Sequence, residues 1–290
     1  MARVNVSGTM VDEKAASISV FDHGLLYGDG VFEGIRVYNR RIFKLGEHLD
    51  RMYDSAKAIF LTIPLQKEDF RAEIIRTCRE NGITSGYLRV IVTRGVGDLS
   101  LNPFICTNQQ YIIIAKEVDP LLGEKSIVSG VDVITSSVRR AGLMAIPVRA
   151  KTLNYLNSVL ALAQALKLGR QEAILFSEGG YVTEGSGDNI FVIKNGTVIT
   201  PPASAGALKG ITRETVIALS RQGGYEVREE NMTSYDLFTA DEMFITGTLA
   251  EIVPVRSVDG QKIGGGEAGM HTKKIASMFR AFTSQERADY

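Results

Sequence analysis

Segments typical of strands and of helices alternate along the whole chain of 290 residues, and this alternation limits the possible fold more than any other feature. Runs rich in β-branched and aromatic residues predict strands, whereas apolar residues repeated every three or four positions predict helices. A chain of this length can form one large domain or two modest ones, each with its own core. We therefore expect an α/β or α+β protein made of two domains.

The first part of the chain predicts two helices among several strands. Apolar residues recur at helical spacing from Leu45 to Leu61, and a second helix from Glu68 to Asn81 ends at an Asn-Gly pair. Residues 117–125 have no clear period and contain a proline and a glycine, which indicates a linker. We expect a smaller domain over 1–116 and a larger one over 126–290. Strands are expected at 16–21, 31–38, 86–93 and 110–116.

The second part continues the alternation. The dipeptide Asn195-Gly196 is typical of a type I′ hairpin turn between two strands. The helix expected over 153–168 is almost uncharged until Lys167, which predicts that it is buried. Further helices are expected at 212–221 and 270–283, and strands at 131–135, 173–177, 189–194, 197–200, 242–246 and 252–258.

Composition excludes several classes of protein. The 33 basic and 33 acidic side chains balance, so bulk charge does not indicate binding to nucleic acid or to an anionic membrane. The two cysteines and three histidines are scattered, so we expect neither a disulfide framework nor a metal site. The first residues contain no apolar run of the signal-peptide type, and no stretch approaches the roughly 20 apolar residues of a membrane span. We expect a cytoplasmic protein.

Lys151 is the first candidate for chemistry. A single lysine is ordinarily a surface residue, but Lys151 has small or apolar neighbours and is followed by the uncharged helix. An acid on a glycine turn, Glu184, follows 33 positions later (184 − 151). Binding of pyridoxal phosphate (PLP) requires an amine for attachment, a carboxylate for the pyridine nitrogen and donors for a phosphate. The amine and the carboxylate are both present here.

Each candidate also has a plainer interpretation. Glu184 can pair with a pyridine nitrogen, or it can be a turn acid that accepts from backbone N–H groups. Tyr155 follows Lys151 by one helical turn and so can reach the same ligand, or it can be a core tyrosine. Thr212, after Gly210, can place a helix start against a phosphate, or it can simply cap that helix.

Two further glycine-rich segments carry weaker information. The turn Thr246-Gly247-Thr248 follows a strand and offers hydroxyl groups, but it is a weak indication when taken alone. The segment Gly28-Asp29-Gly30 lacks the spacing and the following helix of a dinucleotide fingerprint, which disfavours a nucleotide-binding module.

Taken in order, these motifs resemble the fold-type IV (class IV) PLP-dependent aminotransferases, and among them the branched-chain amino acid aminotransferases. The resemblance implies a two-domain α/β (α+β) architecture and runs nearly from end to end. Its markers begin with Asp22-His23-Gly24-Leu25-Leu26-Tyr27-Gly28-Asp29-Gly30-Val31-Phe32-Glu33-Gly34-Ile35-Arg36. They continue with Glu47-His48-Leu49-Asp50-Arg51-Met52, Gly86-Tyr87-Leu88-Arg89, Lys151-Thr152-Leu153-Asn154-Tyr155, Glu184-Gly185-Ser186-Gly187-Asp188-Asn189, Gly210-Ile211-Thr212-Arg213 and Gly247-Thr248-Leu249-Ala250-Glu251-Ile252.

The resemblance implies a role for each matching position. Lys151 corresponds to the catalytic lysine that attaches PLP and moves a proton, Glu184 to the partner of the pyridine nitrogen, and Tyr155 to the hydroxyl on the phenolate oxygen. Leu208 corresponds to the residue that packs on the ring. The phosphate-binding positions are Arg51, Ile211, Thr212 and Thr248. The substrate-binding positions are Tyr27, Phe32, Gly34, Tyr87 and Arg89, with the backbone N–H groups of Thr248 and Leu249 at the α-carboxylate.

The implied activity is transfer of the amino group of leucine, isoleucine or valine to 2-oxoglutarate by a homodimer or larger homo-oligomer. In that family a loop such as the one bearing Tyr27 enters the partner's pocket. Two departures keep alternatives open: Val90 stands where the branched-chain pattern has proline, and Thr93-Arg94-Gly95 is an element of D-amino acid aminotransferases and aminodeoxychorismate lyase. The alternatives are therefore D-amino acid or (R)-amine transamination, or a lyase reaction. A non-catalytic PLP-binding protein is disfavoured by Lys151, Glu184 and Tyr155.

Overall fold

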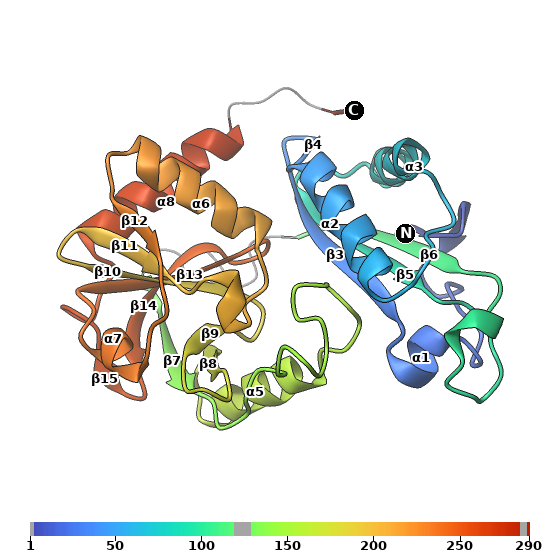
Figure 1. Ribbon diagram of the computed structural model, residues 1–290. Coiled ribbons are helices and arrows are strands. Elements are labelled where there is room, and N and C mark those ends of the chain that lie inside the picture. Colours follow the sequence, from blue (N-terminus) through green and yellow to red (C-terminus); the bar gives the residue numbers. More distant parts are fainter. Residues whose placement is uncertain (1–2, 119–128, 285–288) are drawn as a thin grey trace. The chain divides into compact units, whose positions relative to one another are not determined.

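The computed structural model describes residues 3–118, 129–284 and 289–290 and divides by its contacts into two compact units (Figure 1). The N-terminal unit comprises Met1–Asp119, Ala150–Asn154 and Glu286–Tyr290, and the C-terminal unit comprises Pro120–Arg149 and Tyr155–Gln285. Both contain helices and strands, which confirms the expected α/β (α+β) class. The linker expected at 117–125 lies outside the described residues from position 119 onward.

The N-terminal unit is built on an antiparallel sheet of six strands in the order β2-β1-β6-β5-β3-β4. Helix α2 packs against β3, and α3 packs against β1 and β6 (Figure 1). The strands are β1 (Arg3–Val6), β2 (Thr9–Asp12), β3 (Gly30–Tyr38), β4 (Arg41–Ile42), β5 (Gly86–Thr93) and β6 (Gln110–Glu117). The helices are α1 (His23–Tyr27), α2 (Leu45–Ala58), α3 (Lys67–Glu80) and a 3-10 turn, η1 (Pro103–Ile105).

The periodicity of α2 explains how this unit closes its core. Leu45, Leu49, Met52 and Ala56 recur every three or four residues, so they lie on one face of the helix, and all four are buried. They pack with alternate residues of the two central strands, Val31, Ile35 and Val37 of β3 and Leu88, Val90 and Val92 of β5. Burial of this apolar stripe stabilises the helix on the sheet.

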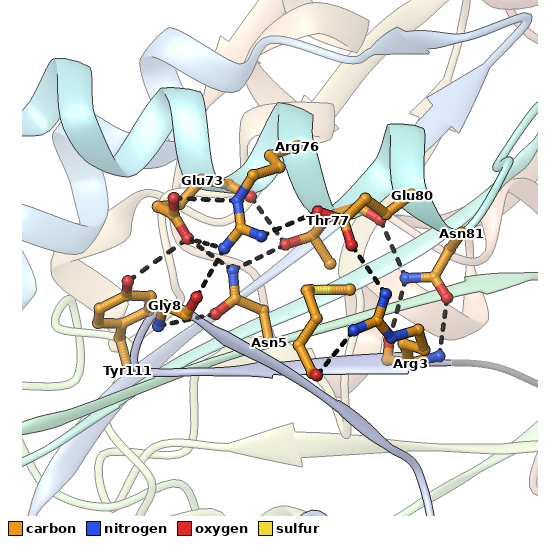
Figure 2. A network of polar contacts seen from close by, with 10 residues as sticks. Arg3, Asn5, Gly8, Glu73, Arg76, Thr77, Glu80, Asn81 and Tyr111 are labelled. Carbon is orange, nitrogen blue, oxygen red and sulfur yellow. Dashed lines mark hydrogen bonds and ion pairs between the residues drawn. The ribbon is translucent and has the colours of Figure 1, made fainter.

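The N-terminal hairpin β1–β2 is joined to α3 by a polar network (Figure 2). The buried side chain of Asn5 donates to Oε2 of Glu73 at 2.8 Å and to Oγ1 of Thr77 at 3.0 Å. Nη2 of Arg76 donates to Glu73 at 2.7 Å and to the carbonyl of Gly8 at 2.9 Å. This network contains no residue predicted to bind cofactor or substrate, so it can serve as a control region in the experiments below.

The C-terminal unit contains a mixed sheet of nine strands, in the order β12-β11-β10-β13-β14-β7-β8-β9 with β15 beside β14. The pairs β11–β12, β14–β7 and β7–β8 are parallel and the others are antiparallel. The strands are β7 (Val131–Thr135), β8 (Glu172–Phe176), β9 (Val182–Gly185), β10 (Asn189–Lys194), β11 (Thr197–Thr200), β12 (Val227–Glu229), β13 (Glu242–Gly247), β14 (Glu251–Val258) and β15 (Gln261–Lys262). The helices are α5 (Leu156–Lys167), α6 (Ile211–Gln222), α7 (Ser234–Phe238), α8 (Met270–Ser284) and the 3-10 turn η2 (Ala203–Ala205).

Three local expectations were wrong. Residues 16–21 form no strand; Val20 and Phe21 are exposed, and the alternating pattern there has no partner strand. The helix expected from 153 begins only at Leu156. The apolar face of α5 is not buried either: Ser158, Ala161 and Ala165 are its buried residues, because small side chains allow a close approach to β8. The leucine side of the helix is exposed, at Leu156, Val159, Leu160 and Leu166.

Candidate active site

Lys151 lies on an extended segment at the edge of β3. The N–H of Leu153 donates to the carbonyl of Gly30 and the N–H of Phe32 to the carbonyl of Lys151, both at 3.0 Å. The N–H of Lys151 itself donates to Oγ of Ser55 on α2, also at 3.0 Å. Its Nζ atom lies 4.7 Å from the centre of the Phe32 ring. The lysine is therefore held by its backbone on both sides while its amine projects over an aromatic ring.

This geometry corrects one argument made from the sequence. Lys151 and Tyr155 were expected to share a helix face, but α5 starts at Leu156 and Tyr155 is only its N-terminal flanking residue. By its contacts Lys151 belongs to the N-terminal unit, whereas Tyr155 belongs to the C-terminal unit. The role expected for Tyr155 cannot rest on helical spacing, because extended pairing with β3 replaced the first turn of the expected helix.

The structure brings four predicted substrate residues together in the N-terminal unit. Gly34 of β3 is directly opposite Arg89 of β5, and the guanidinium carbon of Arg89 lies 4.6 Å from the centre of the Phe32 ring and 5.5 Å from that of Tyr87. A Cβ atom at Gly34 would meet the Tyr87 hydroxyl at 2.1 Å, so only glycine leaves room for that tyrosine. Phe32, Gly34, Tyr87 and Arg89 thus form one cluster with the amine of Lys151.

Glu33, between Phe32 and Gly34, points to the opposite face of β3 and binds Arg51. Nε and Nη2 of Arg51 donate to the two oxygens of Glu33 at 2.7 Å each, and Nδ1 of His48 lies 2.8 Å from Oε2. Burial by itself would raise the pKa of Glu33, but the charges of Arg51 and His48 and their hydrogen bonds lower it to about 2. The pKa of His48 is lowered, chiefly by its burial. Arg51, a predicted phosphate residue, is therefore oriented by a carboxylate that sequence analysis gave no role.

Tyr27 lies apart from this cluster, at the end of α1. Its hydroxyl donates to the carbonyl of Leu99 at 2.8 Å, and its ring contacts His23 edge to face. The side chain is exposed in this chain. The structure therefore places Tyr27 on the surface of the N-terminal unit.

In the C-terminal unit, Glu184 is the penultimate residue of β9, and both of its carboxylate oxygens are held. Nε of Arg140 lies 2.9 Å from Oε1, and the backbone N–H of Leu208 donates to Oε2 at 2.7 Å. Glu184 and Arg140 are both buried. These two contacts fix the direction in which the carboxylate points. Sequence analysis missed Arg140, because its segment has no periodicity and its partner is 44 residues away (184 − 140).

The turn after Glu184 also shapes two other glycine segments. Nδ2 of Asn189 donates to the carbonyl of Leu208 at 2.9 Å, and its Oδ1 would be 2.0 Å from a Cβ atom at Gly210. Likewise, Oδ1 of Asp188 would be 2.0 Å from a Cβ atom at Gly247. Glycine is required at both places because a neighbouring side chain occupies the space. One turn thus positions Leu208, the start of α6 and the turn that leads to Thr248 and Leu249.

The start of α6 has the properties of an anion site. The helix begins at Ile211, its N-cap is Gly210 rather than Thr212, and no side chain caps it. Thr212 is buried in the first turn. Free N–H groups and the helix dipole at such a start favour a phosphate. The amine of Lys151, the held carboxylate of Glu184 and this helix start are the kinds of group that PLP binding requires, so the residues present fit PLP.

Residues 30–258 match the family model for class IV amino-transferases, which is most of the chain. The chain therefore belongs to the class IV aminotransferase family. A Methanocaldococcus jannaschii protein provisionally named as a branched-chain-amino-acid aminotransferase is 51% identical over 278 residues, covering 96% of this chain and 95% of its own length. The branched-chain-amino-acid aminotransferase of Escherichia coli K12 is 38% identical over 288 residues, covering 98% of this chain and 93% of its own.

Solved structures agree with this relationship. The branched-chain amino acid aminotransferase of Escherichia coli has a TM-score of 0.93 and 38% identity, covering 99% of this chain and 96% of that one. Another solved branched-chain amino acid aminotransferase, with pyridoxamine 5′-phosphate, has a TM-score of 0.94 and 37% identity, covering all of this chain and 96% of that one. A D-alanine aminotransferase of Listeria monocytogenes is more distant, at 36% identity over 286 residues, covering 96% of this chain and 94% of its own length.

The described residues contain neither a membrane-spanning helix nor a metal-ligand cluster. None of their helices is long and apolar enough to span a membrane. Nor do three of their His, Cys, Asp or Glu side chains gather as metal ligands.

Proposed function

We propose that this protein is a PLP-dependent aminotransferase that reversibly transfers the amino group of leucine, isoleucine or valine to 2-oxoglutarate, giving branched-chain 2-oxo acids and glutamate. The observation that carries the proposal is the end-to-end relationship to branched-chain enzymes, at 38% to 51% identity and with a TM-score of 0.94 for a solved member. The clusters around Lys151 and Glu184 supply the chemical groups that this reaction needs.

The residue roles follow from the chemistry of the groups. PLP, when bound, supplies an electron sink for the negative charge at the substrate α-carbon. Nζ of Lys151 holds the cofactor and moves the proton at that carbon, which requires an amine that is partly neutral. The carboxylate of Glu184, oriented by Arg140, would pair with the pyridine nitrogen and favour its protonated form. Tyr155 donates to the phenolate oxygen, and Leu208 packs on the ring.

In this proposal the phosphate ligands are an arginine side chain and a helix start, with one added hydroxyl. Arg51 contributes a guanidinium that Glu33 already orients, and Ile211 and Thr212 contribute the uncapped start of α6. Thr248 adds a hydroxyl, and its N–H with that of Leu249 serves the substrate α-carboxylate. A phosphate dianion favours both kinds of donor, because a helix start and an arginine each offer positive potential.

The substrate pocket combines an apolar wall with one cation. Phe32, Tyr87 and the backbone of Gly34 would line the wall against a branched side chain, where each buried CH₂ contributes about 0.8 kcal/mol. Arg89 lies over Phe32 at 4.6 Å and can pair with the distal carboxylate of glutamate. The same pocket therefore takes an apolar and an acidic side chain in turn.

The alternative is D-amino acid or (R)-amine transamination, or an aminodeoxychorismate lyase reaction, on the same scaffold. The Thr93-Arg94-Gly95 element favoured it, together with the more distant D-alanine aminotransferase relative. The position of Arg94 weakens that argument, because its guanidinium is bound by Asp29 and by two backbone carbonyls. An arginine held in this way does not distinguish substrates by direct contact.

We further propose a homodimer or larger homo-oligomer in the cytoplasm. The support for association is the exposed leucine face of α5, where Leu156 is 70% and Val159 is 58% exposed, since apolar side chains gathered on a surface favour contact with another protein. The exposed Tyr27 is then available to a partner subunit. The division into domains at 1–116 and 126–290 also remains a proposal. The segment Ala150–Asn154 lies in the second of these ranges but belongs by its contacts to the N-terminal unit.

The substrate assignment can be tested through the amino donor that removes the visible absorption of bound PLP. We expect leucine, isoleucine, valine and glutamate to do so rapidly, and D-alanine and (R)-amines slowly or not at all. A faster reaction with D-alanine or an (R)-amine would select the alternative.

Arg89→Ala sharpens the same test. We expect the glutamate half-reaction to lose much more rate than the leucine half-reaction, because only glutamate has a distal carboxylate for Arg89. Stopped-flow measurement of each half-reaction separates the two, with Arg76→Ala in the remote network of Figure 2 as the control. Equal losses in both half-reactions would mean that Arg89 serves the α-carboxylate or the fold.

A further inference from the structure

Arg94 is almost completely buried in the N-terminal unit, at 5% exposure, and its guanidinium is held by several partners. Nε and Nη2 donate to the two oxygens of Asp29, at 2.9 and 2.8 Å. Nη2 also donates to the carbonyl of Ile59 at 2.7 Å, and Nη1 donates to the carbonyl of Phe60. This side chain therefore joins two segments that are 30 residues apart (59 − 29).

The first of these segments leads directly to Lys151. Asp29 is followed by Gly30, Val31 and Phe32, which pair with Leu153, Thr152 and Lys151 through two backbone hydrogen bonds of 3.0 Å and one bridge. The carbonyl of Asp29 also accepts from the N–H of Arg94 at 3.0 Å. Gly28, on the other side of Asp29, accepts from Nδ2 of Asn154 at 3.0 Å. Movement of Asp29 would therefore move the strand against which the lysine segment lies.

The second segment is the C-terminal end of α2. Ile59 flanks the last turn of that helix, and Phe60 follows it with a φ of 57°. Carbonyls at a helix end carry partial negative charge, so a cation there is stabilising. Helix α2 also carries Ser55, whose hydroxyl accepts from the N–H of Lys151 at 3.0 Å. Arg94 thus binds both elements that hold the backbone of Lys151.

We propose that Arg94 is a positioning residue for Lys151, acting through Asp29 and through the end of α2. The inference rests on the proposed function, in which Lys151 is the attachment point for PLP. Arg94 has no direct contact with substrate in this arrangement. The Thr93-Arg94-Gly95 element thus helps to fix the catalytic amine and does not choose the amino donor.

The experiment compares Arg94→Met, Arg94→Lys, and the double variant Arg94→Met with Asp29→Asn. Arg76→Met serves as the matched control, since it removes an arginine with carboxylate and carbonyl partners from the remote network. Three quantities are measured for each protein: thermal unfolding, turnover with leucine and with D-alanine, and the pH dependence of acylation of Lys151 in the cofactor-free protein. Mass spectrometry of the labelled peptide gives the last quantity, which does not depend on activity of the loaded enzyme.

Arg94→Met should lower kcat with leucine by about 100-fold, the scale expected for a misplaced catalytic group. The KM for leucine should change little, and turnover with D-alanine should fall by the same factor. The acylation profile of Lys151 should shift along the pH axis. Arg94→Lys should recover part of both losses, because an ammonium can reach Asp29 but cannot form the fork. Arg76→Met should leave kcat and the acylation profile unchanged.

The double variant separates positioning from simple stability. Arg94→Met alone leaves the partly buried Asp29 without its arginine partner, so the variant can fail to fold. Replacing both charges removes that problem, and the melting temperature should recover while kcat and the acylation profile stay altered. The inference is wrong if kcat and the acylation profile of the double variant both recover to wild-type values. It is also wrong if the ratio of leucine to D-alanine turnover changes several-fold.

Failure of the proposed function would look different. If Lys151→Ala retains activity, Lys151 is not the attachment point for PLP, whatever the result with the Arg94 variants. If Lys151→Ala is inactive but the Arg94 variants keep wild-type kcat and acylation of Lys151, only the positioning role is overturned.

Discussion

The two units hold their candidate site residues by different physical means. In the N-terminal unit, arginines are fixed by carboxylates: Arg51 by the buried Glu33, and the buried Arg94 by the partly buried Asp29. In the C-terminal unit, most positions are set by backbone groups, including the uncapped start of α6 and the two glycine turns near residues 210 and 247. Glu184, with Arg140, repeats the pattern of the first unit.

This difference determines which substitutions do damage. Removing one member of a buried ion pair leaves the other charge without compensation, at a cost of about 3–5 kcal/mol. Backbone N–H groups survive side-chain substitution, so a site built from them loses only the hydroxyl that is removed. We therefore expect single substitutions to do more harm among the candidate residues of the N-terminal unit than among those of the C-terminal unit.

The largest effect is expected for Lys151→Ala. No other amine in the sequence matches the attachment position, so the variant should lose transamination and the visible absorption of bound PLP. Absorption spectra and a coupled assay with leucine and 2-oxoglutarate measure both. Full activity would refute the assignment of the N-terminal unit as the source of the catalytic amine.

Glu33→Gln should produce the next largest effect, because Arg51 would lose its buried counter-charge. We expect a loss of about 3–5 kcal/mol in the free energy of unfolding at neutral pH, together with weaker retention of PLP. Urea unfolding and dialysis against PLP-free buffer measure the two. Glu80→Gln, in the more exposed network of Figure 2, is the control and should cost much less.

The loss of stability in Glu33→Gln should also depend on pH. The pKa of Glu33 is lowered from 4.5 to about 2, so its contribution to stability is complete above 4.5 and is lost as the pH falls toward about 2. The stability gap between wild type and Glu33→Gln should therefore narrow across that interval. A gap that stays constant down to pH 2 would mean that the Glu33 charge is not what stabilises this region.

A smaller effect is expected in the C-terminal unit from Thr212→Val and Thr248→Val. Each would remove one hydroxyl from a charged phosphate, worth roughly 1.5–3 kcal/mol of PLP affinity, while the backbone donors remain. Equilibrium binding of PLP to the single and double variants measures the losses. An unchanged affinity in the double variant would move the phosphate to another site.

The smallest effect is expected from Glu172→Gln. Oε1 of Glu172 accepts from the N–H groups of Ala173 at 2.6 Å and Ser186 at 2.9 Å, which an amide oxygen can also do. Burial raises the pKa of Glu172, only partly countered by its hydrogen bonds to Ser186 and neighbouring groups. Its stabilising contribution is therefore complete below the ordinary value of 4.5 and is lost as the pH rises through the raised pKa.

The stability of Glu172→Gln should thus match that of the wild type near pH 4.5. It should fall less than that of the wild type as the pH rises above this value. Thermal unfolding over a series of pH values tests this. A variant that is less stable than the wild type at every pH would indicate that the ionised carboxylate is needed.

Local pattern predicted most elements but not the partners of the site residues. Strand β5 has the bounds that were expected, and α2, α3 and α6 begin within one residue of the expected positions. By contrast, the segment around Lys151 was predicted to be helical and is extended. Its hydrogen bonds go to β3 and Ser55, which are more than 90 residues earlier in the chain. A pattern in a short window contains no information about such a partner.

The sequence by itself determined the order of elements, the family and the residues able to bind PLP, because periodicity and ordered motifs are local properties. Only the tertiary structure decided which charges meet: Glu33 with Arg51, Asp29 with Arg94, and Arg140 with Glu184. It also decided that α5 packs through its alanines and leaves its leucines exposed. These outcomes depend on the path of the chain between distant segments, since burial and Coulomb energy are set by distances in space.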